Sequence, residues 1–562
     1  MLSAQQVAAH DTPGSCWIIV SGKVYDVTEF LFEHPGGSAI LLKHAGKDAT
    51  AAYEVAHGPE IIEEGLPSEK KKGAVDPSTI QAHPKGQEAV KKDAVKPKRM
   101  PLAQIINLYD FEENAKENLS QKAWAFFSSG ATDMLSVGLN QRAYRQVLFR
   151  PRGMIDVGIP PTNPQLQQDG TWNTMTSTKM LGVPVSLPLM ICPTGMSRLS
   201  HPSGERSFAT AAGQTGIIQV ISTGASVGLS QIIQAKSRPD QKFFFQLYVN
   251  KDRAKTEMLV QQVVDTGCCV GLIVTIDAAA PGKREADERG ELDVPIVSGI
   301  YSATYKVDAK GGGIGRIMGS YLDPALTWAD LAWLKGLVPA WMKLGVKGVQ
   351  SVEDALLAYD LGCDVIWLSN HGGRALDTAP PALYTLLELN QSHPRIFKPR
   401  SRPLSSRIVN IISTSTTSDP NRPSMPRIPP PTTPKARAAA IASLRAYHRE
   451  GAPEIYVDGG VRRGTDVVKA LCLGAKAVGM GRPFVYALGW EATGVEKAIE
   501  IIRDEVETTM KLLGVTSLVQ LGPHLLNTKA IDRRDNYEVV GCHVSRPTRA
   551  AFVEHQGDRA PD

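Results

Sequence analysis

The segment Val365-Ile366-Trp367-Leu368-Ser369-Asn370-His371-Gly372-Gly373-Arg374 is the most informative part of this chain. Its first four residues are apolar and favour a buried strand of a parallel sheet. The residues that follow place a histidine and an arginine three positions apart, just beyond the end of that strand. In an α/β barrel this rim carries the catalytic residues. Because a histidine can accept a proton near neutral pH and an arginine can hold a carboxylate, the pattern indicates proton abstraction from an anionic substrate.

Seven further apolar runs resemble this strand, and most are separated by helical patterns. The eight runs are Pro188–Ile191, Ile217–Ile221, Phe243–Phe245, Leu272–Val274, Met342–Val346, Val365–Leu368, Ile455–Val457 and Ala477–Met480. Strands that alternate with helices pair in parallel, so the sequence predicts an α/β fold with a closed (β/α)8 (TIM) barrel. An open doubly wound sheet is the alternative, but the G-x-G-x-x-G turn expected after its first strand is missing.

The length of 562 residues implies at least two domains. Residues 1–75 form one small predicted domain, with strand signals at Cys16–Val20 and Lys23–Val27. Residues 76–100 are rich in lysine, proline, glycine and alanine, and we expect a flexible basic linker there. Contact of this linker with an anionic membrane or an acidic partner is the less favoured interpretation. The barrel is expected over 101–535, with a C-terminal tail over 536–562.

Two insertions interrupt the barrel pattern. The first, from about Glu285 to Asp323, carries three consecutive glycines and has the character of a lid at the barrel mouth. The second covers 399–435 and is rich in serine, threonine and proline, so we expect it to be disordered. Either a tolerated surface excursion or translated intron sequence accounts for it.

Composition excludes several classes of protein. The net charge of +5 is small and no basic patch is interleaved with aromatic residues, which disfavours nucleic-acid binding. The seven cysteines are scattered without a C-x-x-C pair, which argues against a disulfide framework or a zinc site. No apolar run reaches the ~18–20 residues of a membrane span. No presequence is recognisable, so a cytoplasmic protein is expected.

Polar residues follow most of the predicted strands. They include Cys192-Pro193-Thr194-Gly195, Ser222-Thr223-Gly224, Gln246-Leu247-Tyr248, Thr275-Ile276-Asp277 with Arg284 beyond it, Lys347, Asp458-Gly459-Gly460-Val461-Arg462 and Gly481-Arg482. Glycine amides and arginines after the last two strands of a barrel are typical of a phosphate site. So many polar strand ends are hard to explain by packing alone.

Residues 1–75 resemble cytochrome b5. The matching stretches are Cys16-Trp17-Ile18-Ile19, Val24-Tyr25-Asp26-Val27-Thr28-Glu29-Phe30, His34-Pro35-Gly36-Gly37 and Ala45-Gly46-Lys47-Asp48-Ala49-Thr50, followed by His57. The resemblance implies a b-type heme with His34 and His57 as the axial ligands of its iron. A six-coordinate iron of this kind carries electrons rather than binding oxygen.

Residues 101–535, apart from the 399–435 insertion, resemble the family of FMN-dependent enzymes that oxidise 2-hydroxy acids. The segments that carry the resemblance are Ser369–Arg374, Val457–Asp466 and Gly479–Pro483. Joined to the heme domain, the chain resembles the flavocytochrome b2 family of L-lactate:cytochrome c oxidoreductases. The resemblance implies FMN and heme b as cofactors, a cytochrome c or another one-electron acceptor, and a homo-oligomer, commonly a tetramer. A mitochondrial intermembrane location would also fit that family.

The resemblance assigns a role to each matching residue. His371 is the general base, Asp277 stabilises its protonated ring, and Arg374 with Arg284 binds the substrate carboxylate. Tyr248 contacts the substrate and Lys347 stabilises the reduced flavin. The residues implied to contact the flavin ring are Pro193, Thr194, Ser222, Gln246 and Thr275, and those implied to hold the phosphate end are Asp458, Gly459, Arg462, Gly481 and Arg482.

Three departures from the family pattern lie in the substrate pocket. Phe126 stands where a tyrosine hydroxyl usually binds the substrate carboxylate, which would cost roughly 1.5–3 kcal/mol of binding if nothing compensates. Gly195 and Gly224 replace larger residues. They predict a pocket that prefers a bulky 2-hydroxy acid, such as mandelate, over lactate, unless neighbouring side chains refill the space.

Two other functions are compatible with the sequence. One is an oxidase that passes electrons to oxygen, which would release hydrogen peroxide. The other is a catalytically inactive heme or flavin binding protein. Phe126 is a faint sign of inactivity, whereas His371, Asp277, Arg374 and Lys347 oppose it.

Overall fold

The computed structural model describes residues 1–31, 38–50, 66–76, 99–158, 174–289, 313–398, 427–446 and 451–532, with a few isolated residues between these ranges. Both predicted heme ligands, His34 and His57, lie outside the described residues. The same holds for nearly all of the 76–100 linker, for most of the 399–435 insertion and for the 536–562 tail.

The N-terminal part contains a small antiparallel sheet with short helices. The sheet order is β1(Asp11–Thr12), β2(Ser15–Val20), β3(Lys23–Asp26), β4(Lys71–Ala74), and the helices are α1(Ala4–Ala8) and α2(Ser38–Lys43). Its core contains Ile18, Tyr25 and Leu31, which pack with Ala45 and Tyr53. Both predicted strand signals are therefore strands, in the α+β arrangement that the sequence predicts.

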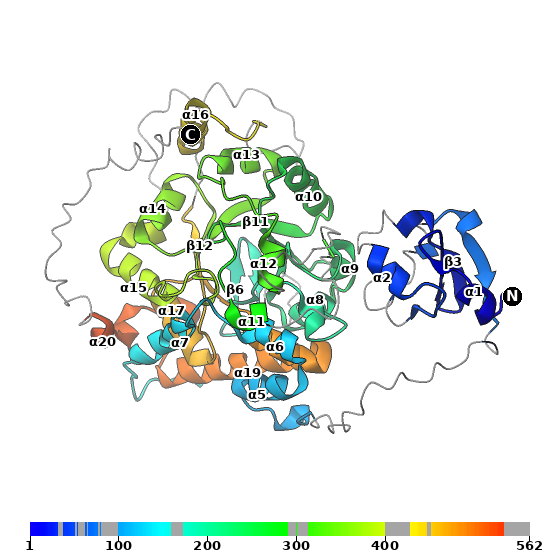
Figure 1. Cartoon of the computed structure of the whole chain (residues 1–562). Helices are drawn as coiled ribbons and strands as arrows, with labels where there is room; N and C mark the ends of the chain where they lie inside the picture. Colours follow the sequence, from blue (N-terminus) through cyan, green and yellow to red (C-terminus); the bar gives the residue numbers. More distant parts are fainter. Residues whose placement is uncertain are drawn as a thin grey trace.

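Eight parallel strands close into a barrel, which confirms the predicted fold class (Figure 1). The strands are β8(Leu189–Ile191), β9(Ile218–Ser222), β10(Phe243–Leu247), β11(Cys269–Thr275), β12(Lys343–Val349), β13(Val365–Leu368), β14(Glu454–Asp458) and β15(Ala477–Met480). Each predicted apolar run coincides with one strand. Pairing of β15 with β8 closes the ring.

Helices surround this barrel. Those that follow the strands are α8(Glu205–Thr215), α9(Leu229–Gln234), α10(Arg253–Asp265), α13(Asp330–Leu337), α14(Val352–Asp360), α15(Ala382–Ser392), α16(Pro434–Ala446), α17(Gly464–Cys472), α18(Arg482–Ala487) and α19(Glu491–Leu512). Before the barrel come α5(Leu108–Asn118), α6(Gln121–Ser128) and α7(Leu135–Gln146), while α11(Glu285–Arg289), α12(Ile314–Gly319) and α20(Lys529–Asp532) complete the set. Two antiparallel pairs lie outside the ring: the hairpin of β6(Thr178–Met180) with β7(Val183–Val185), and the pair of β5(Leu148–Phe149) with β16(Leu526–Asn527), which are distant in the sequence.

The strands carry two different cores, one on each face. Outward-facing residues pack against the helices in a large cluster, whereas inward-facing residues such as Val220, Phe244, Ile273, Trp367 and Tyr456 form a separate cluster inside the barrel. Because side chains alternate along a strand, the next inward positions lie two residues further on. Those positions hold Ser222, Gln246, Thr275, Ser369 and Asp458, and Lys347 of β12 pairs with Thr275 at the same level. The inward face therefore turns from apolar to polar at the carboxyl end of the strands.

The end of the second insertion is ordered rather than disordered. Residues 427–435 are described, and α16 begins at Pro434, inside the predicted disordered range. Proline is favoured in the first turn of a helix because its missing N–H needs no partner there. The prediction of disorder is therefore wrong for these last residues, and 399–426 lie outside the described part.

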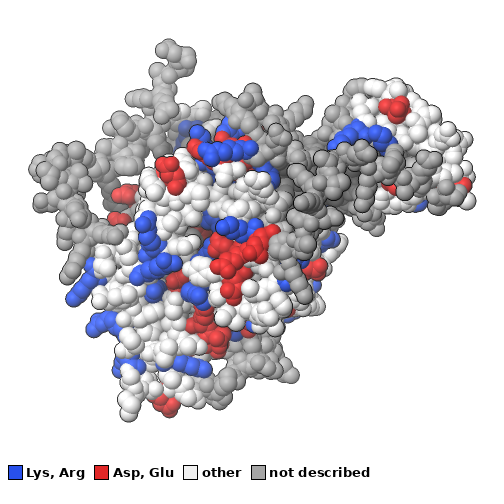
Figure 2. All heavy atoms as spheres, turned by 60° about the horizontal axis from the view of Figure 1, so that its bottom comes forward, with Lys and Arg blue, Asp and Glu red and all other residues white. Residues whose placement is uncertain are grey.

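Two further expectations can be compared with the described residues. Six cysteines are described, and all six are buried and outside any disulfide. No helix among the described residues is long and apolar enough to cross a membrane. On the face shown in Figure 2, acidic and basic side chains are interspersed over the described surface.

The interior packing gives a test by substitution of glycine. A Cβ on Gly479 would lie 2.6 Å from Cys192 Sγ and 2.9 Å from Trp367, inside the barrel core. We expect Gly479→Ala to lower the free energy of unfolding by about 1–3 kcal/mol through overpacking. Gly138→Ala is the matched control, because Gly138 lies within α7 and nothing but Arg142, at 3.8 Å, comes within 4 Å of the added Cβ. Gly138→Ala should leave the free energy of unfolding unchanged or raise it by up to about 1 kcal/mol. Equal changes in the free energy of unfolding for the two variants, measured in denaturant melts, would contradict this packing.

Candidate active site

The site is a cavity of about 510 Å³ above the polar layer of the barrel. Most of the residues predicted to form the site lie at strand ends or in the first turn beyond a strand. Pro193, Thr194 and the pocket residues outside these turns are the exceptions. Every residue predicted to contact flavin or substrate lines it: Phe126, Pro193, Thr194, Gly195, Ser222, Gly224, Gln246, Tyr248, Thr275, Asp277, Arg284, Lys347, His371, Arg374, Asp458, Gly459, Arg462, Gly481 and Arg482. The structure thus brings the whole predicted set together in one place. Their individual roles stay predictions.

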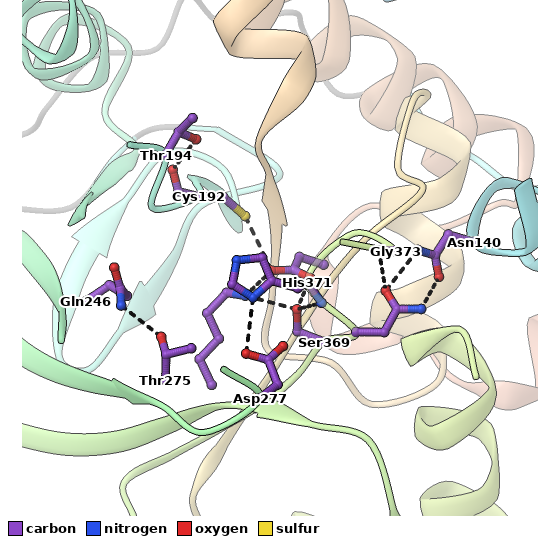
Figure 3. A network of polar contacts seen from close by, with 12 residues as sticks. Asn140, Cys192, Thr194, Gln246, Thr275, Asp277, Ser369, His371 and Gly373 are labelled. Carbon is purple, nitrogen blue, oxygen red and sulfur yellow. Dashed lines mark hydrogen bonds and ion pairs between the residues drawn. The ribbon is translucent and has the colours of Figure 1, made fainter. Parts of the chain in front are cut away.

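His371 and Asp277 form a close pair at the centre of the site (Figure 3). Nδ1 of His371 lies 3.1 Å from a carboxylate oxygen of Asp277, and Nε2 lies 3.3 Å from the Tyr248 hydroxyl. Burial opposes ionisation of Asp277, but the nearby His371 outweighs it and holds the pKa of this carboxyl below its ordinary value. An ionised Asp277 favours the proton on Nδ1, which leaves Nε2 as the base that faces the cavity.

The turn that carries His371 is unusual for a histidine. His371, Gly372 and Gly373 all have positive φ, at 61°, 65° and 78°. For a residue with a Cβ this conformation costs about 1–2 kcal/mol. The backbone N–H of His371 donates to Ser369 Oγ at 3.0 Å, and the side-chain amides of Asn370 and Asn140 donate to each other at 2.9 Å. These bonds hold the strained turn against α7.

Two arginines converge on one side of the cavity, with Asp287 as the carboxylate that pairs with Arg284. The guanidinium carbons of Arg374 and Arg284 lie 5.0 and 5.1 Å from the centre of the Phe126 ring. Arg374 donates to the Phe126 carbonyl at 2.8 Å, and Arg284 has Asp287 as a partner at 3.8 Å. Burial, reinforced by Arg284 and Arg482, holds the pKa of Arg374 well below its ordinary value. An arginine keeps its charge in proteins, so this cluster favours an anionic ligand.

Lys347 lies at the floor of the cavity in a buried polar network. Its Nζ is 3.1 Å from Asp458 and donates to Ser369 Oγ at 2.9 Å, while Ser369 donates to Asp458 at 2.5 Å. Burial lowers the pKa of Lys347, but Asp458 and Asp277 outweigh it and hold that pKa above its ordinary value. A permanent cation therefore faces the cavity from below. Ser369 links it to the His371 turn.

The predicted phosphate end is built from glycines and arginines that already have protein partners. Arg462 pairs with Glu112 at 2.8 Å, and Arg482 donates to the carbonyls of Phe127, Ser129 and Gly372 at 2.9–3.0 Å. The carboxylate of Asp458 is held by Lys347 and Ser369 rather than by these arginines. Asp458 therefore lies nearer the predicted ring end than the predicted phosphate end.

These residues fit an FMN molecule in chemical type. Ser222, Gln246 and Thr275 present hydroxyl and amide groups beside the Lys347 cation, as a flavin ring requires. At the other end, Gly459 has a φ of 93°, and a Cβ on Gly481 would lie 3.7 Å from Cys192 and 3.8 Å from the Thr194 hydroxyl, beside the cavity that both glycines line. Backbone that lacks side chains can approach a phosphate closely.

The structure gives the two pocket glycines, Gly195 and Gly224, roles that differ from the predicted enlargement of the pocket. A Cβ on Gly195 would lie 2.6 Å from the Gly224 carbonyl oxygen, which accepts a hydrogen bond from the Met196 N–H. Gly195 therefore allows two strand-end loops to meet rather than simply enlarging the pocket. Above Gly224, the methyl carbon of Met318 occupies part of the space. This is the refilling that the sequence left open.

Several residues that shape the site were not predicted to act there. Asp377 accepts hydrogen bonds from the N–H groups of Asp133, Leu135 and Ser136 and from the Thr132 hydroxyl, and so joins the His371 loop to α7. Its position three residues after Arg374 was the available signal. Glu112, Asn140 and Met318 gave no signal, because each meets the site only through the tertiary fold.

Comparisons with known proteins agree with this geometry. Residues 115–397 and 435–528 match the FMN-dependent dehydrogenase family, and residues 3–76 match the cytochrome b5-like heme/steroid binding domain. The chain is similar to the L-lactate dehydrogenase (cytochrome) of Saccharomyces cerevisiae, with 36% identity over 546 residues, which cover 95% of this chain and 80% of the yeast protein. It is 32% identical to the glycolate oxidase of Spinacia oleracea over 74% of this chain and 94% of that protein.

Solved structures give the same picture. A double mutant of flavocytochrome b2 with pyruvate bound is 35% identical, with a TM-score of 0.58 over 82% of this chain and 94% of that chain. A soluble mutant of the membrane-associated (S)-mandelate dehydrogenase from Pseudomonas putida is 26% identical, with a TM-score of 0.56 over 75% of this chain and 99% of that chain.

The Asp377 carboxylate gives a test of how the site is held. Burial opposes its ionisation, but the hydrogen bonds from Ser136 and Thr132 outweigh it and hold the pKa below its ordinary value. We expect Asp377→Asn to lower the free energy of unfolding by about 1.5–3 kcal/mol at pH 7, because an amide N–H₂ would face N–H donors.

The sign of the pH dependence follows from this lowered pKa. The ionised carboxylate contributes its stability above the pKa of the unfolded chain, about 3.9, and loses it as the pH falls through the lower folded-state value. The difference in free energy of unfolding between wild type and Asp377→Asn should therefore be constant above about pH 5 and become smaller below about pH 4. A difference that grows on acidification, measured by denaturant melts, would refute the assignment.

Proposed function

Because this chain belongs to the FMN-dependent dehydrogenase family and also carries a cytochrome b5-like heme-binding domain, we propose that it oxidises an L-2-hydroxy acid to the 2-oxo acid and delivers the electrons to a cytochrome c or a similar one-electron acceptor. The class of the enzyme, an FMN-dependent 2-hydroxy-acid dehydrogenase, and its two cofactors, FMN and heme, follow from that membership. When bound, FMN accepts two electrons and the heme iron carries them one at a time.

The observation that carries the proposal is the placement of opposite charges around His371. Arg374 and Arg284 lie on one side, where Asp287 pairs with Arg284 at 3.8 Å and no ion pair to Arg374 occurs among the described residues, and Asp277 lies behind the imidazole. A 2-hydroxy carboxylate bound to the arginines presents its reacting carbon and hydroxyl to Nε2 of His371. The imidazole takes the proton that the substrate loses, and Asp277 stabilises the charge that results.

The residues around this pair keep the proton transfer oriented. Tyr248 contributes a hydroxyl 3.3 Å from Nε2, and burial with the nearby Asp277 raises the pKa of Tyr248 to about 12. Tyr248 therefore stays protonated and can donate a hydrogen bond to the substrate. The Phe126 ring supplies no hydroxyl, but it lies against both guanidinium groups, and such cation–π contacts contribute about 0.5–2 kcal/mol.

We further propose that the preferred substrate has a side chain larger than the methyl group of lactate. The support is Gly224, which leaves the strand-end wall of the pocket without a side chain. The group nearest to the position of a Cβ on Gly224 is the flexible side chain of Met318, at 2.5 Å, ahead of the Ser222 hydroxyl at 3.6 Å. Oligomerisation, as implied by the family resemblance, is part of the same proposal.

An anaerobic visible spectrum of the holoenzyme, recorded before and after addition of L-lactate or L-mandelate, tests the function. We expect the flavin absorbance to bleach and the bands of reduced b-type heme to appear, with a higher kcat/KM for mandelate. Bleached flavin with oxidised heme, and hydrogen peroxide in air, would favour an oxidase. No change with either acid would contradict a dehydrogenase of these substrates, and a clear preference for lactate would remove the bulky-substrate proposal.

The role of Asp277 gives a second test. We expect Asp277→Asn to lower kcat by roughly 100- to 10,000-fold, since the charge that supports protonated His371 is lost. Retention of bound FMN, measured by its absorbance, should be unchanged. The matched control is Asp240→Asn, because Asp240 is a surface residue with 63% of its side chain exposed. A loss of less than about threefold for Asp277→Asn would exclude its role.

A further inference from the structure

Met318 is the side chain that closes the substrate pocket opposite Gly195 and Gly224. Its methyl carbon lies 2.5 Å from where a Cβ on Gly224 would stand and 3.2 Å from where a Cβ on Gly195 would stand. A larger residue at Gly224 and the present position of Met318 therefore exclude each other. The thioether occupies, from the helix side, space that a strand-end residue would otherwise fill.

The helix that carries Met318 is held at both ends. At its start, the buried carboxylate of Asp287 accepts hydrogen bonds from the N–H groups of Ile314 and Gly315, at 3.1 and 2.9 Å. Beyond its end, the Lys251 N–H donates to the Tyr321 carbonyl at 2.9 Å. Since Ile314 and Ile317 are also buried in the core, the backbone of α12 is fixed.

The fit of α12 against the arginine side of the pocket is equally tight. A Cβ on Gly315 would overlap the guanidinium group of Arg284, and a Cβ on Gly319 would lie 2.9 Å from Pro281. The helix therefore cannot move inward or outward by much without displacing these neighbours. Any adjustment of the pocket has to come from a side chain.

Met318 is suited to such an adjustment, unlike the walls formed by Phe126, Tyr248 and the two glycines. It is unbranched and only partly buried, and methionine side chains have three rotatable bonds and adapt to irregular spaces. By contrast, Phe126 lies against two guanidinium groups and Tyr248 contacts His371. Gly195 and Gly224 have no side chain to move.

We propose that Met318 is a specificity-determining residue that forms the adjustable wall of the side-chain subsite. This inference rests on the proposed oxidation of 2-hydroxy acids. With a small acid such as lactate, the Met318 methyl stays over Gly224 and contacts the substrate. With an aromatic or an extended unbranched side chain, Met318 turns aside and the substrate occupies the space above Gly224.

The test compares Met318→Ala, Met318→Leu and Gly224→Leu in the holoenzyme, with L-lactate, L-mandelate and L-2-hydroxyoctanoate as substrates. We expect Met318→Ala to raise the ratio of kcat/KM for mandelate over lactate by about tenfold or more, the range that one or two methylene groups provide in an apolar pocket. Gly224→Leu should lower that ratio by a similar factor. Met318→Leu keeps the side-chain volume but introduces a branch. It should therefore lower kcat/KM for the two larger acids more than for lactate.

The double variant Gly224→Leu/Met318→Ala provides the sharpest test. Because the two side chains compete for one space, the changes should be strongly non-additive, and the double variant should recover lactate turnover lost by Gly224→Leu alone. Met258→Ala is the matched control, since Met258 is 59% exposed on α10 and should leave every ratio unchanged.

A binding measurement separates this inference from the proposed function. The oxidised holoenzyme is titrated calorimetrically with pyruvate and with benzoylformate. We expect Met318→Ala to raise the affinity for benzoylformate, relative to the affinity for pyruvate, by tenfold or more. If the wild type oxidises none of the acids, the proposed function fails whatever the variants bind. The inference about Met318 is overturned if the wild type does oxidise the acids but Met318→Ala changes kcat/KM for lactate and mandelate by the same factor. The affinities for pyruvate and benzoylformate would then also change by one common factor.

Discussion

The buried ammonium group of Lys347 is the constraint around which the rest of the site is organised. A cation inside a barrel is costly unless other groups pair with it. Asp458 and Ser369, from the two strands that follow β12, meet it at 3.1 and 2.9 Å, and Asp277 adds a second negative charge nearby. The same Ser369 hydroxyl accepts the N–H of His371. One charge thereby orders three strand ends and the turn that bears the base.

The distribution of charge gives the site a direction. The carboxylates of Asp277 and Asp458 lie close to His371 and Lys347, whereas Arg284 and Arg374 lie together against Phe126. This separation of charge favours the proposed orientation of an anionic substrate, with its carboxylate at the arginines and its reacting carbon toward the imidazole. The protein achieves this selection with fixed charges, before any cofactor chemistry is considered.

Much of the fold and of the site was predictable from the sequence, for reasons that are local. A buried parallel strand is a short apolar run, so β13 and its seven neighbours were recognisable, and the strand ends marked Lys347, Asp277 and His371. What could not be predicted depends on contacts between distant segments. The carboxylate of Asp458 turns to Lys347, Arg462 pairs with Glu112, and Met318 reaches Gly224 from an insertion with no apolar periodicity. The start of α16 at Pro434 was missed because the Ser/Thr/Pro-rich composition of 399–435 predicted disorder up to its last residue.

Chemistry and selectivity are carried by different parts of the polypeptide. The base, the cations and their partners stand at strand ends and in the turns beyond them, whereas Met318 stands on α12, which is held by Asp287. The glycines of α12 contact Arg284 and Pro281 closely, so Met318 is the position of this helix at which a substitution alters the pocket with least effect on the arginine side. In evolutionary terms, selectivity for different 2-hydroxy acids can diverge through this one position while the reaction mechanism stays the same.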